Sequence, residues 1–188
     1  LSNSTAACWG NNNYGQLGNG TTTSSTTPVA VTGGALTGKT VTNITAGDHT
    51  CAVLSDGTAA CWGQNDQGQL GDGTTTNSTT PVAITSGALT GKTVTNITAG
   101  DYHICAILSN STAACWGNNN YGQLGNGTTT NSTTPVAVTG GALAGKTVTN
   151  ITAGGDHTCA VLSDGTAACW GYNNQGQLGD GTTTNSTT

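Results

Sequence analysis

The sequence predicts an all-β protein assembled from tandem copies of one structural unit. Trp9, Trp62, Trp116 and Trp170 are spaced 53, 54 and 54 residues apart, and the residues around them are almost identical. A fixed period of this length indicates one supersecondary unit stacked on copies of itself, because a single copy cannot bury its own apolar face. Short runs rich in Val, Ile and Thr alternate with Gly-rich loops, and no segment shows helical periodicity.

Each full repeat contains four short segments with strand character. In the copy that begins at Pro28 we expect strands at Pro28–Thr32, Thr40–Thr45, His49–Leu54 and Thr58–Trp62. Four strands in a repeat of this length are typical of a β-propeller blade. The fold class is therefore all-β, with tandem four-stranded antiparallel blades of a β-propeller. We expect the Gly-Gln-Leu-Gly element that follows, Gly68–Gly71, to be a turn that locks one blade to the next.

The chain is expected to form a single repeat array with no separate domains. It holds about three and a half repeats, so we expect that this chain alone does not close a ring. The missing initiator Met and the start within a hairpin favour a processed piece of a longer protein. The predicted units are a partial repeat over 1–27 and full repeats over 28–80, 81–134 and 135–188.

Composition excludes several classes of partner. Only 6% of the residues are charged, and three lysines against eight acidic residues give a net charge of −5. A nucleic-acid partner requires a basic face that displaces counterions, which three lysines cannot build. No apolar run has the length of a membrane span.

Six of the seven cysteines fall into pairs with nine residues between them, one pair in each predicted hairpin. Gly57 suits the left-handed position of a short hairpin loop, so that Leu54 faces Thr58 and Cys51 faces Cys61 at a non-hydrogen-bonded site. The strand spacing there is within reach of a disulfide. The alternative is that these cysteines are free, buried and act as small hydrophobes. The predicted disulfides are Cys51–Cys61, Cys105–Cys115 and Cys159–Cys169, while Cys8 is left without a partner and is a candidate for an inter-chain bond.

The predicted disulfides and the scarcity of Lys and Glu favour an extracellular or cell-surface location. Asn-x-Ser/Thr sequons are frequent in this Asn- and Thr-rich chain. Those in the Thr-rich loops are the acceptors that we expect if a glycosylating cell secretes the protein, namely Asn77, Asn131 and Asn185.

The remaining motifs predict no cofactor, no metal site and no catalytic residue. Gly33–Thr40 matches the phosphate-binding pattern G-x4-G-K-T, but a β-branched segment follows where that site needs a helix, so we expect a hairpin loop. His49 and its equivalents are expected to be structural and to hydrogen-bond across the blade. Zinc is excluded by the cysteine spacing. A calcium site at Asn65, Asp66 and Asp72, a set that Asp180 repeats in part, is the less favoured interpretation of an oxygen-rich loop.

One repeat resembles a known consensus over its whole length. Its matching residues are Val94, Ile97, Gly100, His103, Ala106, Leu108, Trp116, Gly117, Asn119, Gly122, Gln123, Leu124 and Gly125. These residues resemble the regulator-of-chromosome-condensation repeat family, in the tandem form of secreted bacterial members. The resemblance implies blades of a propeller that members typically close with seven units, and a role in protein–protein contact.

Two functions remain open from the sequence. The first is a non-enzymatic extracellular interaction module, a propeller or part of one, that presents loops to a protein or glycan partner. The second is a structural subunit of an extracellular fibre or surface assembly. In that case an open array exposes strand edges that another chain completes, so that the protein self-associates into a ring or filament.

Overall fold

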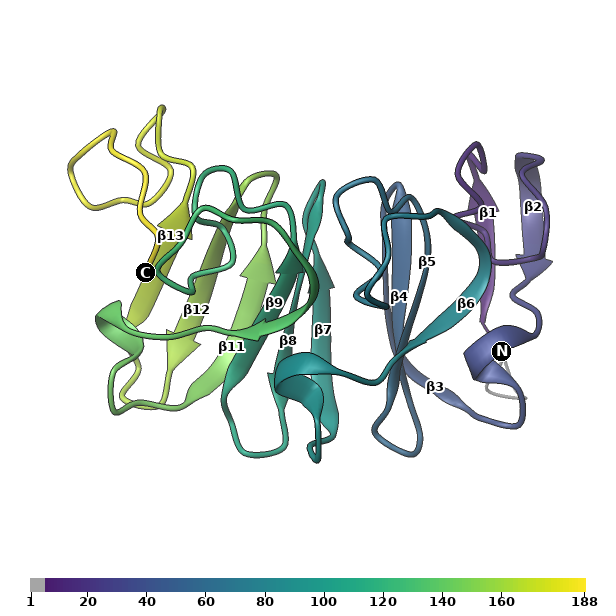
Figure 1. The fold of residues 1–188 in the computed structure, drawn as a ribbon, viewed down its shortest axis with the longest axis horizontal. Coiled ribbons are helices and arrows are strands. Elements are labelled where there is room, and N and C mark those ends of the chain that lie inside the picture. The colour runs from purple at the N-terminus through teal and green to yellow at the C-terminus, as the bar shows by residue number, and fades with distance from the viewer. Residues whose placement is uncertain (1–5) are drawn as a thin grey trace.

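The computed structural model describes residues 6–188, which form antiparallel sheets arranged side by side along the chain (Figure 1). The first partial blade pairs β1 (Ala7–Gly10) with β2 (Ser25–Ala30). The first full blade has the order β3 (Val41–Ala46), β4 (His49–Leu54), β5 (Ala59–Gly63) and β6 (Ser78–Ile84). The second full blade has the order β7 (Val94–Ala99), β8 (His103–Leu108), β9 (Ala113–Gly117) and β10 (Ser132–Ala137). The third blade contains β11 (Val148–Ala153), β12 (His157–Leu162) and β13 (Ala167–Gly171), and a bridge joins Gly171 to Ser186.

The all-β prediction is confirmed, but the sheets are offset from the sequence repeat. The strand predicted at Pro28–Thr32 lies at Ser25–Ala30 and pairs with β1, so it is the fourth strand of the preceding blade and not the first strand of its own repeat. The segment with the phosphate-binding pattern is not a hairpin loop. It crosses from β2 in one sheet to β3 in the next through the single-turn 3₁₀ helix η1 (Gly34–Leu36). Two equivalent turns, η2 (Gly87–Leu89) and η3 (Gly141–Leu143), make the later crossings.

The cysteine pairs lie in the predicted register. Leu54 N donates to Thr58 O at 2.9 Å, and counting outward from that bonded pair places Cys51 opposite Cys61 at a closely spaced position with Cα atoms 4.1 Å apart. The structure contains all three predicted disulfides, Cys51–Cys61, Cys105–Cys115 and Cys159–Cys169. On the chain-entropy model, closing so short a loop contributes roughly 2–3 kcal/mol for each bridge.

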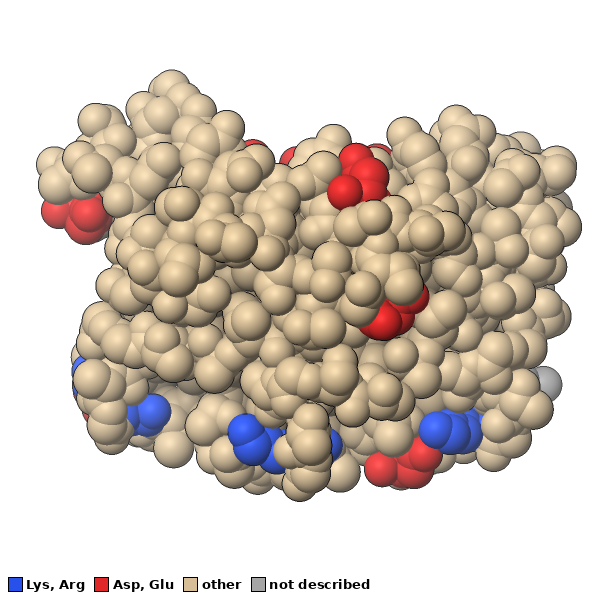
Figure 2. Space-filling view, viewed as in Figure 1, with Lys and Arg blue, Asp and Glu red and all other residues tan. Residues whose placement is uncertain are grey.

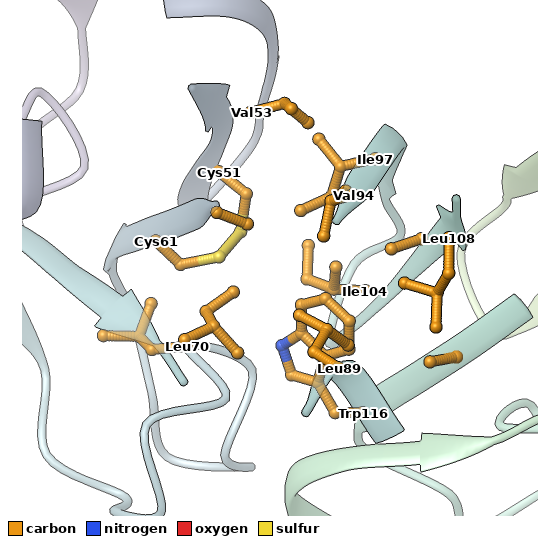
Figure 3. Packing of buried hydrophobic residues seen from close by; sticks show 14 residues of the cluster. Cys51, Val53, Cys61, Leu70, Leu89, Val94, Ile97, Ile104, Leu108 and Trp116 are labelled. Carbon is orange, nitrogen blue, oxygen red and sulfur yellow. A yellow bond between two sulfur atoms is a disulfide. The ribbon is translucent and has the colours of Figure 1, made fainter. Parts of the chain in front are cut away.

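The core lies between the blades. Figure 3 shows the Cys51–Cys61 disulfide and Leu70 of the first full blade facing Ile104 and Trp116 of the second full blade. We call the first surface the disulfide face and the second the Trp face. The same pairing of faces recurs between the second full blade and the third blade, where Cys105 and Cys115 pack in one cluster with Trp170. Each blade therefore supplies a disulfide face to the blade that follows and a Trp face to the blade that precedes it.

The Gly-Gln-Leu-Gly element fastens these faces together, as predicted. Trp116 Nε1 donates to Gln69 O at 3.0 Å, and Leu70, the next residue, is completely buried in the cluster beneath it. A Cβ on Gly71 would lie 2.7 Å from Trp116 Nε1, so the backbone touches the indole where only glycine fits. Two equivalent indole bonds join Trp62 to Gln16 O and Trp170 to Gln123 O, and we call each such contact between an indole and the Gly-Gln-Leu-Gly element a clasp.

The first strands of neighbouring blades also contact each other directly. Asn43 Nδ2 donates to Asn96 Oδ1 at 2.7 Å, and Ala99 N donates to Thr45 Oγ1 at 3.2 Å. Ala153 N makes the equivalent bond to Thr98 Oγ1. These bonds hold β3, β7 and β11 side by side, at the opposite edge of each sheet from the proline-containing strands. Within residues 6–188, no helix is long and apolar enough to cross a membrane.

The contact between Gly71 and the indole gives a testable prediction. Gly71 and Gly179 occupy equivalent positions with the same φ of 70°, but a Cβ on Gly179 would meet nothing within 4 Å. Both Gly71→Ala and Gly179→Ala incur the left-handed backbone cost of roughly 1–2 kcal/mol. Gly71→Ala should lose a further 1–3 kcal/mol or so of unfolding free energy through overpacking against Trp116. Denaturant unfolding of the two variants measures this difference. Equal losses of unfolding free energy would contradict the close contact between Gly71 and Trp116.

Candidate interaction surfaces

The two ends of the blades carry different charges. We call the loop end the end formed by the connections after the first and third strands of each blade, and the turn end the end formed by the hairpin turns and the 3₁₀ helices. All three lysines lie at the turn end, with two aspartates. The loop end carries the other six aspartates and, among residues 6–188, no lysine: Asp48, Asp66, Asp72, Asp101, Asp156 and Asp180. Figure 2 shows this separation, with the blue side chains along the bottom edge.

The turn end neutralises most of its own charge. Lys39 Nζ lies 2.8 Å from Asp56 Oδ2, and Lys146 Nζ lies 2.8 Å from Asp164 Oδ2. Hydrogen bonds from the lysine and from Thr58 lower the pKa of Asp56, and equivalent bonds lower the pKa of Asp164. Asn110 occupies the equivalent position in the second full blade, and there Lys92 donates to Ala88 O instead.

Among residues 6–188, no salt bridge neutralises the aspartates of the loop end. Burial, and then the negative charge of Asp101, raise the pKa of Asp156, and His157 opposes this shift. Gln123 Nε2 donates to Asp156 Oδ1 at 3.2 Å and fixes that side chain. The pKa of Asp180 is lowered by hydrogen bonds from the backbone and side chain of Thr182, not by a cation.

Each long loop at this end is shaped by one completely buried asparagine. Asn65 Oδ1 accepts from Leu70 N at 2.8 Å, and Asn65 Nδ2 donates to the carbonyls of Thr74 and Thr76. Asn12, Asn119 and Asn173 make the same set of bonds in their loops. The oxygen-rich composition of the loop drew attention to Asn65 alone, although the recurrence of an asparagine five positions before the Leu of each Gln-Leu-Gly element indicates a shared structural role.

The predicted glycosylation acceptors bond to the backbone of these same buried asparagines. Asn77 Oδ1 accepts from Asn65 N at 2.8 Å, and Asn131 and Asn185 make the equivalent bonds to Asn119 N and Asn173 N. All three acceptor residues are exposed. Glycosylation there stays a prediction, which the protein's mass before and after glycosidase treatment would check.

Tyrosines add an aromatic component to the loop end. The rings of Tyr121 and Tyr172, from neighbouring blades, have centroids 4.3 Å apart. Tyr14 and Tyr102 are exposed on loops at the same end. Equivalent positions differ from blade to blade, since Gln67 replaces Tyr121 and Asn118 replaces Tyr172 in the adjacent pair, where Asn118 Nδ2 donates to Gln67 Oε1.

The expected histidine bond across one blade is corrected, because the bond that His103 makes joins two blades. His103 Nε2 lies 2.9 Å from Thr158 Oγ1 of the third blade. Because Thr158 Oγ1 donates its proton to Gln123 O, the histidine must be the donor in this pair. Ile104 is the residue equivalent to Thr158 in the second full blade, so His49 is offered no such hydroxyl. Neither ring nitrogen of His49 has a hydrogen-bond partner among the described residues.

Burial keeps both histidines neutral. Burial lowers the pKa of His49 to about 4, with Asp66 opposing the shift. Burial lowers the pKa of His103 to about 3, and the charges of His49 and His157 contribute. No group of three or more potential metal ligands was found in residues 6–188. The loop with Asp66 and Asp72 is likewise organised by Asn65, with Asp72 accepting from Thr74.

Cys8 lies at an exposed edge of the array. It is the free cysteine of the described residues, is partly buried, and burial raises its pKa. Its neighbour Trp9 is 63% exposed, whereas the other three tryptophans are fully buried. A groove of about 140 Å³ beside them is also lined by Ala46, Asp48 and Thr50 of the first full blade.

Sequence comparison agrees with this architecture. The model of the regulator of chromosome condensation (RCC1) repeat matches residues 8–54, 56–107 and 115–161. The chain belongs to the RCC1 repeat family. A second model of the RCC1 repeat matches 41–69, 94–123 and 148–177, which span the first three strands of each blade and end at the Gln of the Gly-Gln-Leu-Gly element.

The proteins to which this chain is similar are considerably longer than the chain itself. The chain is 35% identical over 183 residues to the ultraviolet-B receptor UVR8 of Arabidopsis thaliana, covering 96% of this chain and 40% of that protein. The crystal structure of human WBSCR16 superposes with a TM-score of 0.86 at 25% identity, over 98% of this chain and 47% of that one. Prp20p from Saccharomyces cerevisiae gives a TM-score of 0.80 at 20% identity, over 97% and 45% of the two chains. The RCC1-repeat chain thus spans less than half the length of each.

The buried histidines predict acid sensitivity. Their folded pKa values lie below the unfolded value near 6.5, so the unfolded state binds more protons below that pH, and stability falls as the pH drops from about 6.5 toward 4. We expect a loss on the order of 2 kcal/mol for each histidine between pH 7 and pH 4.5. His103→Gln, which keeps an N–H donor for Thr158, should lose measurably less over the same range. Denaturant unfolding at both pH values measures this, and an equal loss in the variant would contradict the assignment.

Proposed function

We propose that this RCC1-repeat chain is a non-enzymatic protein-interaction module whose loop end binds a partner with a cationic surface. The observation that carries the proposal is the separation of charge, with six aspartates at the loop end and all three lysines at the turn end. A surface of one sign steers an oppositely charged partner toward it and disfavours wrong partners.

The partner is proposed to be a protein. The yeast protein Prp20p, one of the similar structures, is described by its binding properties to Gsp1p and histones, so a chain of this fold presents protein-binding surfaces. In this chain the hydrogen bonds of Asn65 and its equivalents hold the loops in place before binding, which reduces the conformational entropy lost when a partner docks. The exposed tyrosines supply the rigid aromatic contacts that are enriched in interfaces.

We propose that the protein works outside the cell or at its surface. Three disulfides in 188 residues suit an oxidising compartment, and the exposed Asn77, Asn131 and Asn185 are available to a glycosylating enzyme. Recovery of the native protein from a secretory host, with the disulfides formed and compared with protein made in a reducing cytosol, tests this location.

A second candidate function is a subunit of an extracellular assembly. The exposure of Trp9 favours it, because the equivalent side chains are covered by a neighbouring blade. Sedimentation of the native chain over a range of concentrations distinguishes a monomer from an assembly, and a monomer at every concentration would remove this candidate.

The charge separation can be tested with two matched pairs of substitutions. Asp66→Asn with Asp72→Asn removes two of the six negative charges of the loop end, and Asn120 and Asn126 already occupy those positions in the second full blade. Asp56→Asn with Asp164→Asn makes the same change in net charge at the turn end, where Asn110 is the natural precedent. With a fluorescent lysine-rich peptide as the probe, we expect the loop-end pair to weaken binding roughly fivefold and the turn-end pair to leave it almost unchanged.

The expected binding should also weaken as salt is raised from about 0.02 M to 0.15 M, because exposed charges are then screened. Equal effects of the two pairs would show that only net charge matters, and would overturn the assignment of the loop end.

A further inference from the structure

One pair of tyrosines joins the second full blade to the third blade at the loop end. The rings of Tyr121 and Tyr172 have centroids 4.3 Å apart, and their planes are tilted by 39°. This separation lies below the roughly 4.5–7 Å that is usual for aromatic pairs. Both side chains are partly exposed, so each ring contacts the other and is still accessible from solvent.

A short chain of hydrogen bonds connects the two tyrosines. Tyr121 N donates to Gln123 Oε1 at 3.0 Å, and Gln123 Nε2 donates to Asp156 Oδ1 at 3.2 Å. Tyr172 N donates to Asp156 O at 2.9 Å. The loop that carries Tyr121 is therefore bonded through Gln123 to the same aspartate that holds the backbone of Tyr172, which keeps the two rings together.

The fold does not require an aromatic pair at this place. The equivalent residues of the first and second full blades are Gln67 and Asn118, and Asn118 Nδ2 donates to Gln67 Oε1 at 3.2 Å. The equivalent residues of the partial blade and the first full blade are Tyr14 and Gln64. Two tyrosines meet at only one of these three equivalent positions, so reactions that need two phenols in contact are available there.

We infer that Tyr121 and Tyr172 form a site of oxidative cross-linking, at which a haem peroxidase with hydrogen peroxide joins the two rings into a dityrosine. The new bond links the second full blade covalently to the third blade. This modification is a property of two side chains and does not depend on the binding of a cationic partner by the loop end.

The reaction is a balanced two-electron oxidation. Each phenol loses one electron and one proton and becomes a phenoxyl radical, whose unpaired electron is shared between the oxygen and the ring carbons Cε1 and Cε2. One Cε atom of Tyr121 bonds to one Cε atom of Tyr172, and the hydrogen on each of these carbons moves to the phenol oxygen as the ring regains aromaticity. Hydrogen peroxide accepts the two electrons and two protons and is reduced to two water molecules.

Contact between the rings favours this pair over the other tyrosines of the chain. Reactants that are held in position react as in a unimolecular step, at an effective concentration far above that of the protein in solution. Tyr14 and Tyr102 are exposed, and among residues 6–188 neither is paired with a second aromatic ring. Their cross-links therefore require a second molecule and form faster as the protein concentration rises, whereas the cross-link within the pair does not.

The experiment treats the whole chain with a plant haem peroxidase and hydrogen peroxide, after alkylation of Cys8 so that its thiol cannot reduce the radicals. A lysine-specific protease then cuts the unfolded product after Lys146, which separates the fragment that holds Tyr121 from the fragment that holds Tyr172. Each of the three disulfides lies within a single fragment. The two fragments therefore stay joined only if the oxidation has formed a new bond between them.

The expected product is a monomeric chain that is lighter by two hydrogen atoms, has the blue fluorescence of dityrosine and yields the joined fragments. Its rate of formation should not depend on protein concentration. Tyr121→Phe keeps the ring but removes the phenol, and should lower the yield of joined fragments by roughly tenfold or more. Tyr102→Phe removes a tyrosine from the same fragment and should leave the yield unchanged.

Joined fragments that persist in Tyr121→Phe, or that form faster as the protein concentration rises, would show that exposed tyrosines couple at random and would overturn the inference. A chain that forms no dityrosine while the peroxidase oxidises free tyrosine in the same solution would overturn it as well.

Discussion

The contact between a tryptophan and the Gly-Gln-Leu-Gly element of the preceding blade is the interaction on which the rest of this structure depends. The indole N–H bonds to the glutamine carbonyl, the leucine fills the space below, and the glycine lets the backbone touch the ring. The apolar clusters lie between blades, so a single blade could not bury its own disulfide face or Trp face. Stability therefore comes from nearest neighbours, and the exposed Trp9 shows what a blade surface is like without one.

Because the contacts between blades stabilise the fold, the charged residues of the loop end can differ from blade to blade. Asp72 and Asn126 occupy equivalent positions and accept the same hydrogen bonds from Thr74 and Thr128, so the fold is indifferent to which of the two is present. The charge at these positions is thus not required for folding. It accumulates at the loop end, whereas the carboxylates of the turn end pair with Lys39 and Lys146. A surface whose charge is independent of folding is suited to partner selection.

Much of this architecture follows from the sequence. The tryptophan spacing gives the repeat, and the hairpin count outward from Leu54 and Thr58 gives the register of Cys51 and Cys61. Periodicity cannot give the phase of the sheets, however, and so it misplaces β2, which pairs with the hairpin before it. The bond from His103 to Thr158 was missed for a related reason, since it joins residues 55 positions apart in different blades. Composition gives the number of charged residues but not their positions in the fold, so it does not predict that the lysines and most aspartates lie at opposite ends of the blades.

Hydrogen exchange of the four indole N–H groups, followed by NMR, tests the central role of the clasp most directly. The account predicts that the indoles of Trp62, Trp116 and Trp170 are protected by a factor of about a thousand or more, because each is buried and bonded to the preceding blade. The indole of Trp9 should exchange within about tenfold of the rate in an unfolded peptide. Protection of Trp9 equal to that of the others, or free exchange at any of the three, would contradict the account.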